Sequence, residues 1–390
     1  MRFLTRRRSG PILLSLAAAA AAAAVAVPAS ASASTQASPV AGHVYVNDNT
    51  AGTNTIGAFD RHADGTLTPE TGSPFAAGGA GTGAGLASQG ALQISPDGRF
   101  LIAADAGSNQ ISVLRIKDNG SLGLVRGGVV SSGGVLPVSV AIHDDLVYVA
   151  NAGNGGSNYT GFRLNLDGRL EPIAGSAVAL PDGSQPGDVL FNDTGSKLAG
   201  TRVGTSLIDS FTVGGDGRLT AAPGSPFPAQ GLGPFGSEFR PTKPGQLFVS
   251  NAHNGAGAGT VSAYRDSADG TLSSIGSSPF ADLQTAPCWV EITHDGQFLF
   301  TVNTGSGAIS RYSIAPGGAL TLLGSTPVGA TGGVGAVDAR LSPDGGTLFV
   351  DESGAGAVGA FAVNGGTLTE LASSPTLLPA GAAPAGIVAN

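Results

Sequence analysis

The sequence predicts an all-β fold, a seven-bladed β-propeller made of four-stranded antiparallel blades. Three observations predict it: a glycine turn recurs seven times, each unit holds four strand-like stretches between turn residues, and no helical period follows the N-terminal segment. Units of about 50 residues with four strands are typical of propeller blades. Such blades stack face to face and bury both faces of each small sheet.

Residues 1–40 precede the repeats and indicate an export signal with a short linker. Its positive region contains Arg2, Arg6, Arg7 and Arg8. An apolar run covers residues 12–27, and the sequence ASASA at 29–33 offers small-residue cleavage sites. The run is shorter than the roughly 20 residues of a membrane helix, so we expect a secreted protein without stable membrane insertion. The three consecutive arginines leave both the Sec and the twin-arginine routes open.

The propeller domain is predicted to cover residues 41–390. The recurring turn contains Gly65, Gly120, Gly168, Gly217, Gly270, Gly318 and Gly366, at intervals of 55, 48, 49, 53, 48 and 48 residues. The second unit shows its strands most clearly, at 92–95, 100–105, 110–117 and 122–130. Blade 4 is the least regular, because the usual apolar strand is weak at 197–202.

The two ends of the domain predict how the ring closes. Residues 43–46 correspond to the second strand of the other units, so blade 1 lacks its first strand. Residues 383–390 resemble the start of a unit, as at 286–293, and we expect them to supply that strand. Closure of this kind leaves no open sheet edge. The alternative, an open solenoid, needs capping units at both ends.

The composition and net charge of the chain exclude some classes of binding partner. The chain has 19 basic and 27 acidic residues, and four of the basic residues lie in the export signal, which leaves 15 − 27 = −12 for the remainder. Nucleic acid and anionic membranes are therefore poor partners. The single cysteine, Cys288, excludes an intramolecular disulfide, so packing alone must stabilise the fold. We expect a monomer that binds a small molecule or a carbohydrate.

Three segments repeat one pattern of turns and buried strands: SPDGRFLIAADAGSNQISVLRI at 95–116, HDDLVYVANAGN at 143–154 and SPDGGTLFVDESGAGAVGAFAV at 342–363. With the SPF segments at 72–75, 224–227 and 277–280, they resemble the seven-bladed lactonase family, which is similar to bacterial 6-phosphogluconolactonase and fungal carboxymuconate cyclase. The sequence YVAN at 148–151 resembles the YVTN repeat of binding and surface-layer propellers. The resemblance covers residues 42–390 and implies hydrolysis of a lactone.

The innermost strand of each blade lines the channel, so its third position identifies candidate catalytic residues. In blades 2 to 7 this position holds Gln93, Ala141, Leu190, Glu238, Glu291 and Arg340. Two neighbouring carboxylates can raise the pKa of one of them into the range of a general base, and a guanidinium can stabilise an oxyanion. Glu238, Glu291 and Arg340 are thus predicted to catalyse attack of water on a lactone at the channel mouth beside the inter-blade loops. The alternative is that they pair across blade interfaces in a structural role.

Five further residues are candidates for binding: Asp188, Asp338, Trp289, His253 and Arg202. The aspartates lie two positions earlier on their strands, and Trp289 could stack on a sugar or an aromatic lactone. His253 lies in a mouth loop, where an exposed structural role is the alternative. Arg202 is the second candidate cation after Arg340, and this scarcity of cations argues against phosphorylated or tricarboxylate substrates.

Other features point away from catalysis or from cofactors. The resemblance implies a histidine at the entry to an innermost strand, where this chain has Ala91, Ser139, Asp188, Gly236, Trp289 and Asp338. That departure favours the alternative function, a non-catalytic propeller that binds a glycan, a peptide or a cell-envelope component. No histidine pair has metal-ligand spacing, so we expect no metal and no cofactor. Mouth-loop Asn and Asp residues could bind Ca²⁺, or serve their own turns. The glycine-rich run at 78–90 lacks the lysine of a phosphate loop and is expected to be a flexible inter-blade loop.

Overall fold

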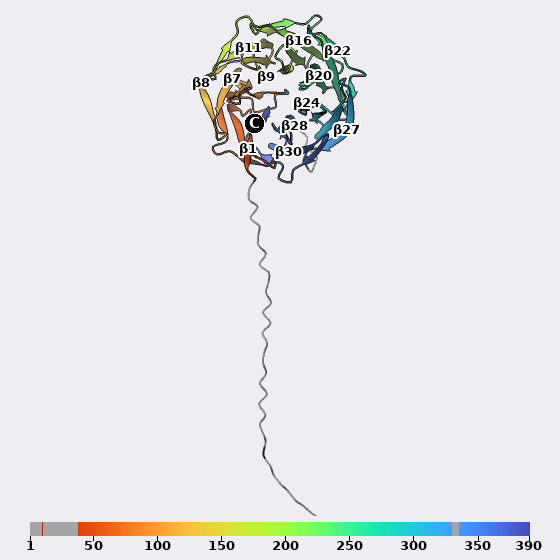
Figure 1. Cartoon of the computed structure of the whole chain (residues 1–390). Coiled ribbons are helices and arrows are strands. Elements are labelled where there is room, and N and C mark those ends of the chain that lie inside the picture. The colour runs from red at the N-terminus through yellow and green to blue at the C-terminus, as the bar shows by residue number, and fades with distance from the viewer. Residues whose placement is uncertain (1–9, 11–37, 330–334) are drawn as a thin grey trace, which may run out of the picture. The chain divides into compact units, whose positions relative to one another are not determined.

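The computed structural model describes residues 10, 38–329 and 335–390, so the predicted export signal lies almost wholly outside the described residues. Residues from Ser38 to Asn390 form one compact unit. Within it, seven antiparallel sheets are arranged in a ring (Figure 1). The predicted seven-bladed propeller is confirmed. No helix within the described ranges is long and apolar enough to span a bilayer.

Most residues of the two inner strands of the blades, taken together, are buried. The innermost strands, in blades 1 to 7, are β33 (Ile387–Ala389), β5 (Leu92–Ile94), β9 (Pro137–His143), β14 (Pro186–Phe191), β19 (Pro234–Arg240), β24 (Pro287–Ile292) and β28 (Ala336–Leu341). The second strands are β1 (Val40–Asn47), β6 (Phe100–Asp105), β10 (Leu146–Asn151), β15 (Lys197–Arg202), β20 (Lys243–Asn251), β25 (Phe298–Asn303) and β29 (Thr347–Glu352). The weak strand of blade 4 therefore forms as β15.

The two outer strands complete each blade. The third strands are β2 (Gly52–His62), β7 (Gln110–Ile116), β11 (Asn158–Leu164), β16 (Leu207–Val213), β21 (Thr260–Asp266), β26 (Ala308–Ile314) and β30 (Ala357–Asn364). The outermost strands are continuous in blades 2 and 6, as β8 (Leu122–Ser131) and β27 (Leu320–Pro327). In the other blades they are divided in two, as β3 (Leu67–Pro69) and β4 (Phe75–Gly81), β12 (Leu170–Pro172) and β13 (Val178–Ala179), β17 (Leu219–Ala221) and β18 (Phe227–Pro228), β22 (Leu272–Ser274) and β23 (Phe280–Ala281), and β31 (Thr367–Glu370) and β32 (Thr376–Leu377). A short 3₁₀ helix, η1 (Ala106–Ser108), follows β6.

The ring closes as the sequence predicts. β33 pairs antiparallel with β1, with Tyr45 opposite Val388, and so becomes the innermost strand of the first blade. The closure extends to the end of the chain, because the Asn390 N–H donates to the His43 carbonyl at 2.9 Å. Blade 1 thereby gains its innermost strand, and β1 is not left as an unpaired sheet edge that could template aggregation.

Apolar side chains between neighbouring sheets hold the blades together. Phe100 and Ile102 of β6, for example, share a buried cluster with Val147 and Val149 of β10. Each fully buried side chain of this size contributes about 1.5–3 kcal/mol. The recurring turn glycines have positive φ in six blades, as at Gly65 with 82°, whereas in blade 7 the left-handed residue is Gly365 and not the predicted Gly366.

Candidate active site

A segment of chain crosses the channel inside the ring. Residues 85–90, which we call the plug, follow β4 and precede β5. The Gln89 backbone N–H donates to the Gly187 carbonyl at 2.9 Å, and its Nε2 donates to the Ser237 carbonyl at 3.0 Å. Its Oε1 accepts the Val290 N–H at 3.0 Å. One glutamine thus bonds to the innermost strands of blades 4, 5 and 6.

The next residue of the plug reaches two more blades. The Gly90 carbonyl accepts the Val140 N–H of blade 3 at 2.9 Å, and the Gly90 N–H donates to Asp338 Oδ2 of blade 7 at 3.2 Å. Gly90 has a φ of 77°, a left-handed conformation that favours glycine. The expectation of a loop at 78–90 is wrong for residues 78–81, which belong to β4, whereas residues 82–90 do connect blades 1 and 2 without forming a strand.

The plug separates two cavities. One, of about 200 Å³, lies toward the turns that join first to second strands and is lined by Gln93, Glu238 and Arg340. The other, of about 470 Å³, lies toward the inter-blade loops and is lined by Trp289 and Asp338. Of the predicted site residues, Asp188, Glu238 and Arg340 line the smaller cavity, and Trp289 and Asp338 line the larger one. The catalytic candidates do not lie at the mouth beside the inter-blade loops where we expected them.

Glu291 and Arg340 form an ion pair beside the smaller cavity. Arg340 Nη1 lies 3.5 Å from Glu291 Oε2, and Glu291 Oε1 accepts the Leu341 N–H at 2.8 Å. The Glu291 side chain is 6% exposed and that of Arg340 is 28% exposed. The charge of Glu291 raises the pKa of Arg340, so the guanidinium remains a cation. Glu291 thereby holds Arg340 in place.

Glu238 is the carboxylate that lines the smaller cavity beside this pair. Its Oε2 atom is buried and has no hydrogen-bond partner among the described residues, and the same is true of Arg340 Nε. Burial first, and then the charge of Glu291, raise the pKa of Glu238 well above its ordinary value, and Arg340 partly offsets them. The structure thus brings the three predicted catalytic residues together and distinguishes Glu238 from Glu291 by its free carboxylate oxygen.

The two aspartates of the channel anchor other strands. Asp188 Oδ2 accepts the Ser237 N–H at 2.9 Å and its hydroxyl at 2.6 Å, while Oδ1 accepts the Ser139 hydroxyl at 3.3 Å. Asp338 accepts the N–H groups of Gly90 and Ala339. Burial raises the pKa of Asp188 to about 7 and that of Asp338 to about 6. Both carboxylates hold blades and plug together.

Stability is expected to fall as the pH rises through the titration of buried carboxyl groups. Burial raises the pKa to about 7 for Asp48, Asp188 and Glu352, and to about 6 for Asp338. Between their unfolded pKa of about 4 and these values, the native state binds more protons than the unfolded state, so the unfolding free energy decreases with rising pH. Melting temperatures measured at pH 5 and pH 8 should be higher at pH 5. An equal or higher value at pH 8 would contradict this expectation.

Of the predicted binding residues Trp289 and His253, the first lies at the wall of a cavity and the second lies in an exposed loop. The Trp289 indole is 4% exposed, donates from Nε1 to the Ser88 carbonyl at 2.7 Å, and packs edge-on against Phe235. It supports the plug and contributes to the wall of the larger cavity. His253 lies in the exposed loop after β20, and neither cavity includes it in its wall. The structure therefore does not bring His253 together with the channel residues.

Arg202 lies away from the channel in a buried ion pair. It is the last residue of β15, and its Nε donates to Asp209 Oδ2 at 2.6 Å. The Tyr159 hydroxyl donates to the same oxygen at 3.0 Å. Arg202 therefore cannot supply the second cation that the sequence suggested for the channel.

Several Asn and Asp residues beside the mouth loops bond within their own blades, whereas both carboxylate oxygens of Asp351 have no hydrogen-bond partner among the described residues. Several polar residues at the end of second strands bond to the residue seven positions later, as in Asp48 with Thr55, Asn151 with Asn158 and Asn303 with Ser310, each at 2.8 Å. These cross-strand bonds recur around the ring. They match the structural alternative to a calcium site.

Gln89 belongs to no repeat, so the repeat pattern does not identify it. The signal that could have found it is the interval of 55 residues between Gly65 and Gly120, the longest in the chain. An insertion between blades 1 and 2 has to lie either on the surface or in the channel. The glycines at 78–90 favour the channel, because a backbone that crosses a narrow channel has little room for side chains.

Removing the plug's side-chain anchor should destabilise the ring. Gln89→Ala leaves the Ser237 carbonyl and the Val290 N–H unpaired in a buried site, which costs about 1–3 kcal/mol. Gly236→Ala should cost more, because an added Cβ would lie 2.1 Å from Gln89 Oε1 and 2.5 Å from the Cys288 carbonyl oxygen. Urea unfolding measures both, with the exposed Gln297→Ala as control. Equal stability of Gln89→Ala and the control would show that the Gln89 side chain contributes nothing to stability.

The fold and the site together define a class of protein: a seven-bladed propeller whose channel contains an acidic cavity with few cations. The family model of the lactonases with a seven-bladed β-propeller matches residues 50–191 and 239–386. The chain therefore belongs to this family. No curated protein sequence matches the chain.

Solved structures show the same fold at low sequence identity. A putative 6-phosphogluconolactonase from Bacteroides uniformis is 19% identical with a TM-score of 0.72, and the match covers 90% of this chain and 99% of that one. A periplasmic gluconolactonase from Pseudomonas aeruginosa is 16% identical with a TM-score of 0.70, over 89% of this chain and 98% of that one. Identities this low support the fold and leave the reaction to be argued from the site.

Proposed function

We propose that the protein is a secreted hydrolase that opens an uncharged or weakly charged lactone in the Glu238 cavity. The observation that carries the proposal is the pair of buried polar atoms, Glu238 Oε2 and Arg340 Nε, that have no partner among the described residues and belong to residues lining one cavity. Buried polar groups are normally satisfied, so such a pair needs an explanation. A lactone and water bound in the cavity would provide its partners once the two side chains turn toward them.

In the proposed reaction Glu238 transfers the proton and Arg340 stabilises the negative charge. The ionised Glu238 carboxylate takes a proton from a water molecule whose oxygen attacks the lactone carbonyl carbon. The Arg340 guanidinium stabilises the oxyanion that forms on the carbonyl oxygen. The tetrahedral intermediate then collapses, the ring C–O bond breaks, and the proton on Glu238 passes to the departing alkoxide. The product is an open-chain hydroxy acid, and Glu238 returns to its ionised state.

The charges around the cavity determine the substrate class. Arg340 is the one cation among the described residues that line it, and Asp188, Asp193 and Glu238 contribute carboxyl groups. A phosphate group needs several cationic or N–H donors for tight binding. The cavity therefore suits neutral lactones better than phosphorylated ones.

A panel of lactones tests the proposal with the purified protein. An unphosphorylated sugar lactone and its 6-phosphate form the matched pair, and we expect the kcat/KM of the neutral member to exceed that of the phosphorylated one by about tenfold or more, equivalent to about 1.4 kcal/mol. A preference for the phosphate would contradict the charge argument. Absence of turnover on every lactone would contradict the reaction itself.

A second candidate function rests on the larger cavity. It has a volume of about 470 Å³, and Leu86, Trp289 and the segment 382–385 give it a largely apolar wall. A non-catalytic propeller would bind a glycan, a peptide or a cell-envelope component there. Binding of a ligand that survives Glu238→Gln and weakens in a Leu86→Asp variant would support this alternative over the hydrolase.

A further inference from the structure

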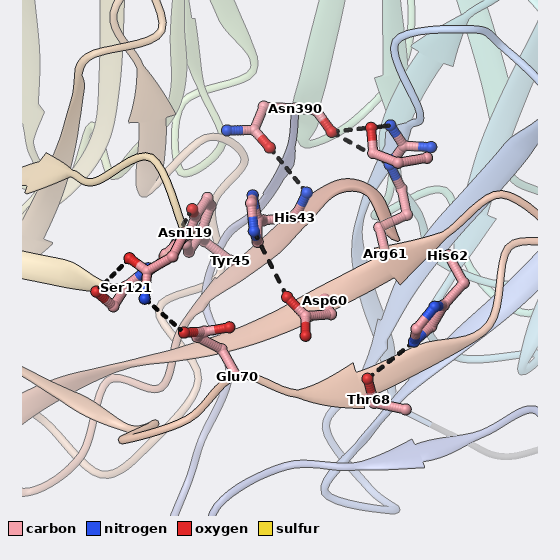
Figure 2. A network of polar contacts seen from close by, with 12 residues as sticks. His43, Tyr45, Asp60, Arg61, His62, Thr68, Glu70, Asn119, Ser121 and Asn390 are labelled. Carbon is pink, nitrogen blue, oxygen red and sulfur yellow. Dashed lines mark hydrogen bonds and ion pairs between the residues drawn. The ribbon is translucent and has the colours of Figure 1, made fainter. Parts of the chain in front are cut away.

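A cluster of three potential metal ligands lies in blade 1, outside the channel. His43 belongs to β1, Asp60 to β2, and Glu70 follows the end of β3. Figure 2 shows the imidazole of His43 directed at Asp60, with Glu70 nearby. One nitrogen or oxygen atom from each of the three side chains lies within 4.8 Å of the other two. Three separate segments of chain thus meet at one point.

The two carboxylates of this cluster have few compensating partners. Among the described residues, no lysine or arginine forms an ion pair with Asp60 or Glu70, and the only ion pair is that of His43 Nε2 with Asp60 Oδ1 at 3.5 Å. Glu70 is 7% exposed, and Asn119 Nδ2 reaches its Oε1 only at 3.5 Å. Neighbouring Arg61 instead donates to backbone carbonyls, including that of Asn390. Burial, followed by the proximity of Asp60, raises the pKa of Glu70.

A comparison of blades shows that packing does not require a glutamate here. The Glu70 N–H donates to the carbonyl of Ala58 on the third strand at 2.9 Å. The residues that make the same bond in blades 3, 4, 5 and 7 are Ile173, Ala222, Ile275 and Leu371. All four are apolar. Blade 1 therefore replaces an apolar residue of the blade seam with a carboxylate that faces a histidine and a second carboxylate.

We propose that His43 Nε2 and the carboxylates of Asp60 and Glu70 bind one divalent transition-metal ion, with Zn²⁺ as the best fit. Zinc takes histidine nitrogen and carboxylate oxygen at about 2.0–2.2 Å in tetrahedral geometry, which places neighbouring ligand atoms about 3.3–3.5 Å apart. The 3.5 Å between His43 Nε2 and Asp60 Oδ1 matches that separation. Ca²⁺ and Mg²⁺ prefer all-oxygen ligand sets and fit less well. This site departs from the sequence prediction of no metal, and it is independent of the proposed lactonase site.

The position of the site gives the ion a structural role. The backbone N–H of His43 donates to Asn390 Oδ1 at 2.8 Å, and the His43 carbonyl accepts the Asn390 N–H at 2.9 Å. These bonds belong to the pairing of β1 with the ring-closing segment. The Tyr45 hydroxyl, two residues away, donates to the Gly120 carbonyl of blade 2 at 2.9 Å. An ion on His43 would therefore stabilise both the ring closure and the seam between blades 1 and 2.

Zinc titration of the purified protein, first stripped with EDTA and dialysed, tests the site. Calorimetry should show one Zn²⁺ per chain, and the melting temperature should rise by about 3 °C at 100 times the Kd. Glu70→Leu gives blade 1 the leucine that blade 7 has at the equivalent position, Leu371. The variant should therefore fold, and its zinc affinity should be at least tenfold lower. Glu70→Gln serves if the leucine variant does not fold. His253→Ala, which removes an exposed histidine, should leave zinc binding unchanged.

Four results would overturn the site. The first is a wild-type protein that binds no zinc at one equivalent. The second is a Glu70 variant that folds and retains wild-type affinity. The third is binding that disappears in His253→Ala while Glu70→Leu retains it, because that result would place the ion on the surface loop. Mg²⁺ or Ca²⁺ binding as tightly as Zn²⁺ would contradict the role of His43 as a ligand.

Discussion

Glu238→Gln is expected to reduce lactone hydrolysis by about 10²–10⁴-fold, the usual contribution of a general base. The amide keeps the shape of the side chain but cannot accept the proton of the attacking water. The melting temperature should stay the same or rise slightly at neutral pH, since the substitution replaces a buried group whose pKa is raised by burial and by Glu291. Steady-state kinetics and thermal unfolding on the same preparation give both results.

Two variants provide the comparison for this result. Glu171→Gln changes an exposed glutamate of β12 and should leave activity unchanged. Glu291→Gln removes the partner of Arg340 but can still accept the Leu341 N–H, so we expect a smaller loss of kcat than in Glu238→Gln. If Glu238→Gln retained full activity while Glu291→Gln lost it, the assignment of the base would be wrong.

The largest expected effect on stability is that of Arg202→Ala, which should lower the unfolding free energy by about 3–5 kcal/mol. The side chains of Arg202 and Asp209 are 10% and 2% exposed. Removing the guanidinium leaves the Asp209 carboxylate buried with the Tyr159 hydroxyl as its remaining side-chain partner, a far larger loss than that of a surface pair. Urea denaturation at pH 7 measures the change.

The matched control for Arg202→Ala is Arg218→Ala, which breaks the exposed pair with Asp216 and should change stability little. Lactone turnover of folded Arg202→Ala should equal that of the wild type, because Arg202 does not line the channel cavity. A stable Arg202→Ala protein with impaired turnover would contradict the structural role and restore Arg202 as a ligand of the channel.

The propeller could be predicted because its determinants are repeated and local. Each blade repeats the same glycine turn and strand lengths, and in blade 2 the predicted strand at 100–105 coincides with β6. Closure could be predicted as well, because the missing strand of blade 1 has a counterpart at 383–390, of which β33 is part. Because the units repeat, the spacing of the neighbouring blades also locates the weak strand of blade 4.

The site was predicted less completely than the fold, because some of the residues that shape it belong to no repeat. Glu238, Glu291 and Arg340 hold one repeat position in neighbouring blades, and the structure places them together. The plug belongs to no repeat, so its division of the channel into two cavities could not be inferred from strand positions. Asp209, the partner of Arg202, lies in the next strand of the same blade, and a single sequence gives no signal that the two side chains are buried as a pair.

The metal cluster illustrates the same limit. His43, Asp60 and Glu70 are 17 and 10 residues apart, spacings that match no metal motif. They meet because β1, β2 and β3 are adjacent in one sheet. Only the register of that sheet, with His43 directly opposite Asp60, brings the ligands together.

A crystal structure of Glu238→Gln with a neutral lactone that the wild type hydrolyses would show where the substrate binds. We expect an intact lactone in the cavity of about 200 Å³, with its carbonyl oxygen within hydrogen-bond distance of the Arg340 guanidinium. A lactone in the cavity of about 470 Å³ beside Trp289, on the other side of the plug, would contradict this expectation.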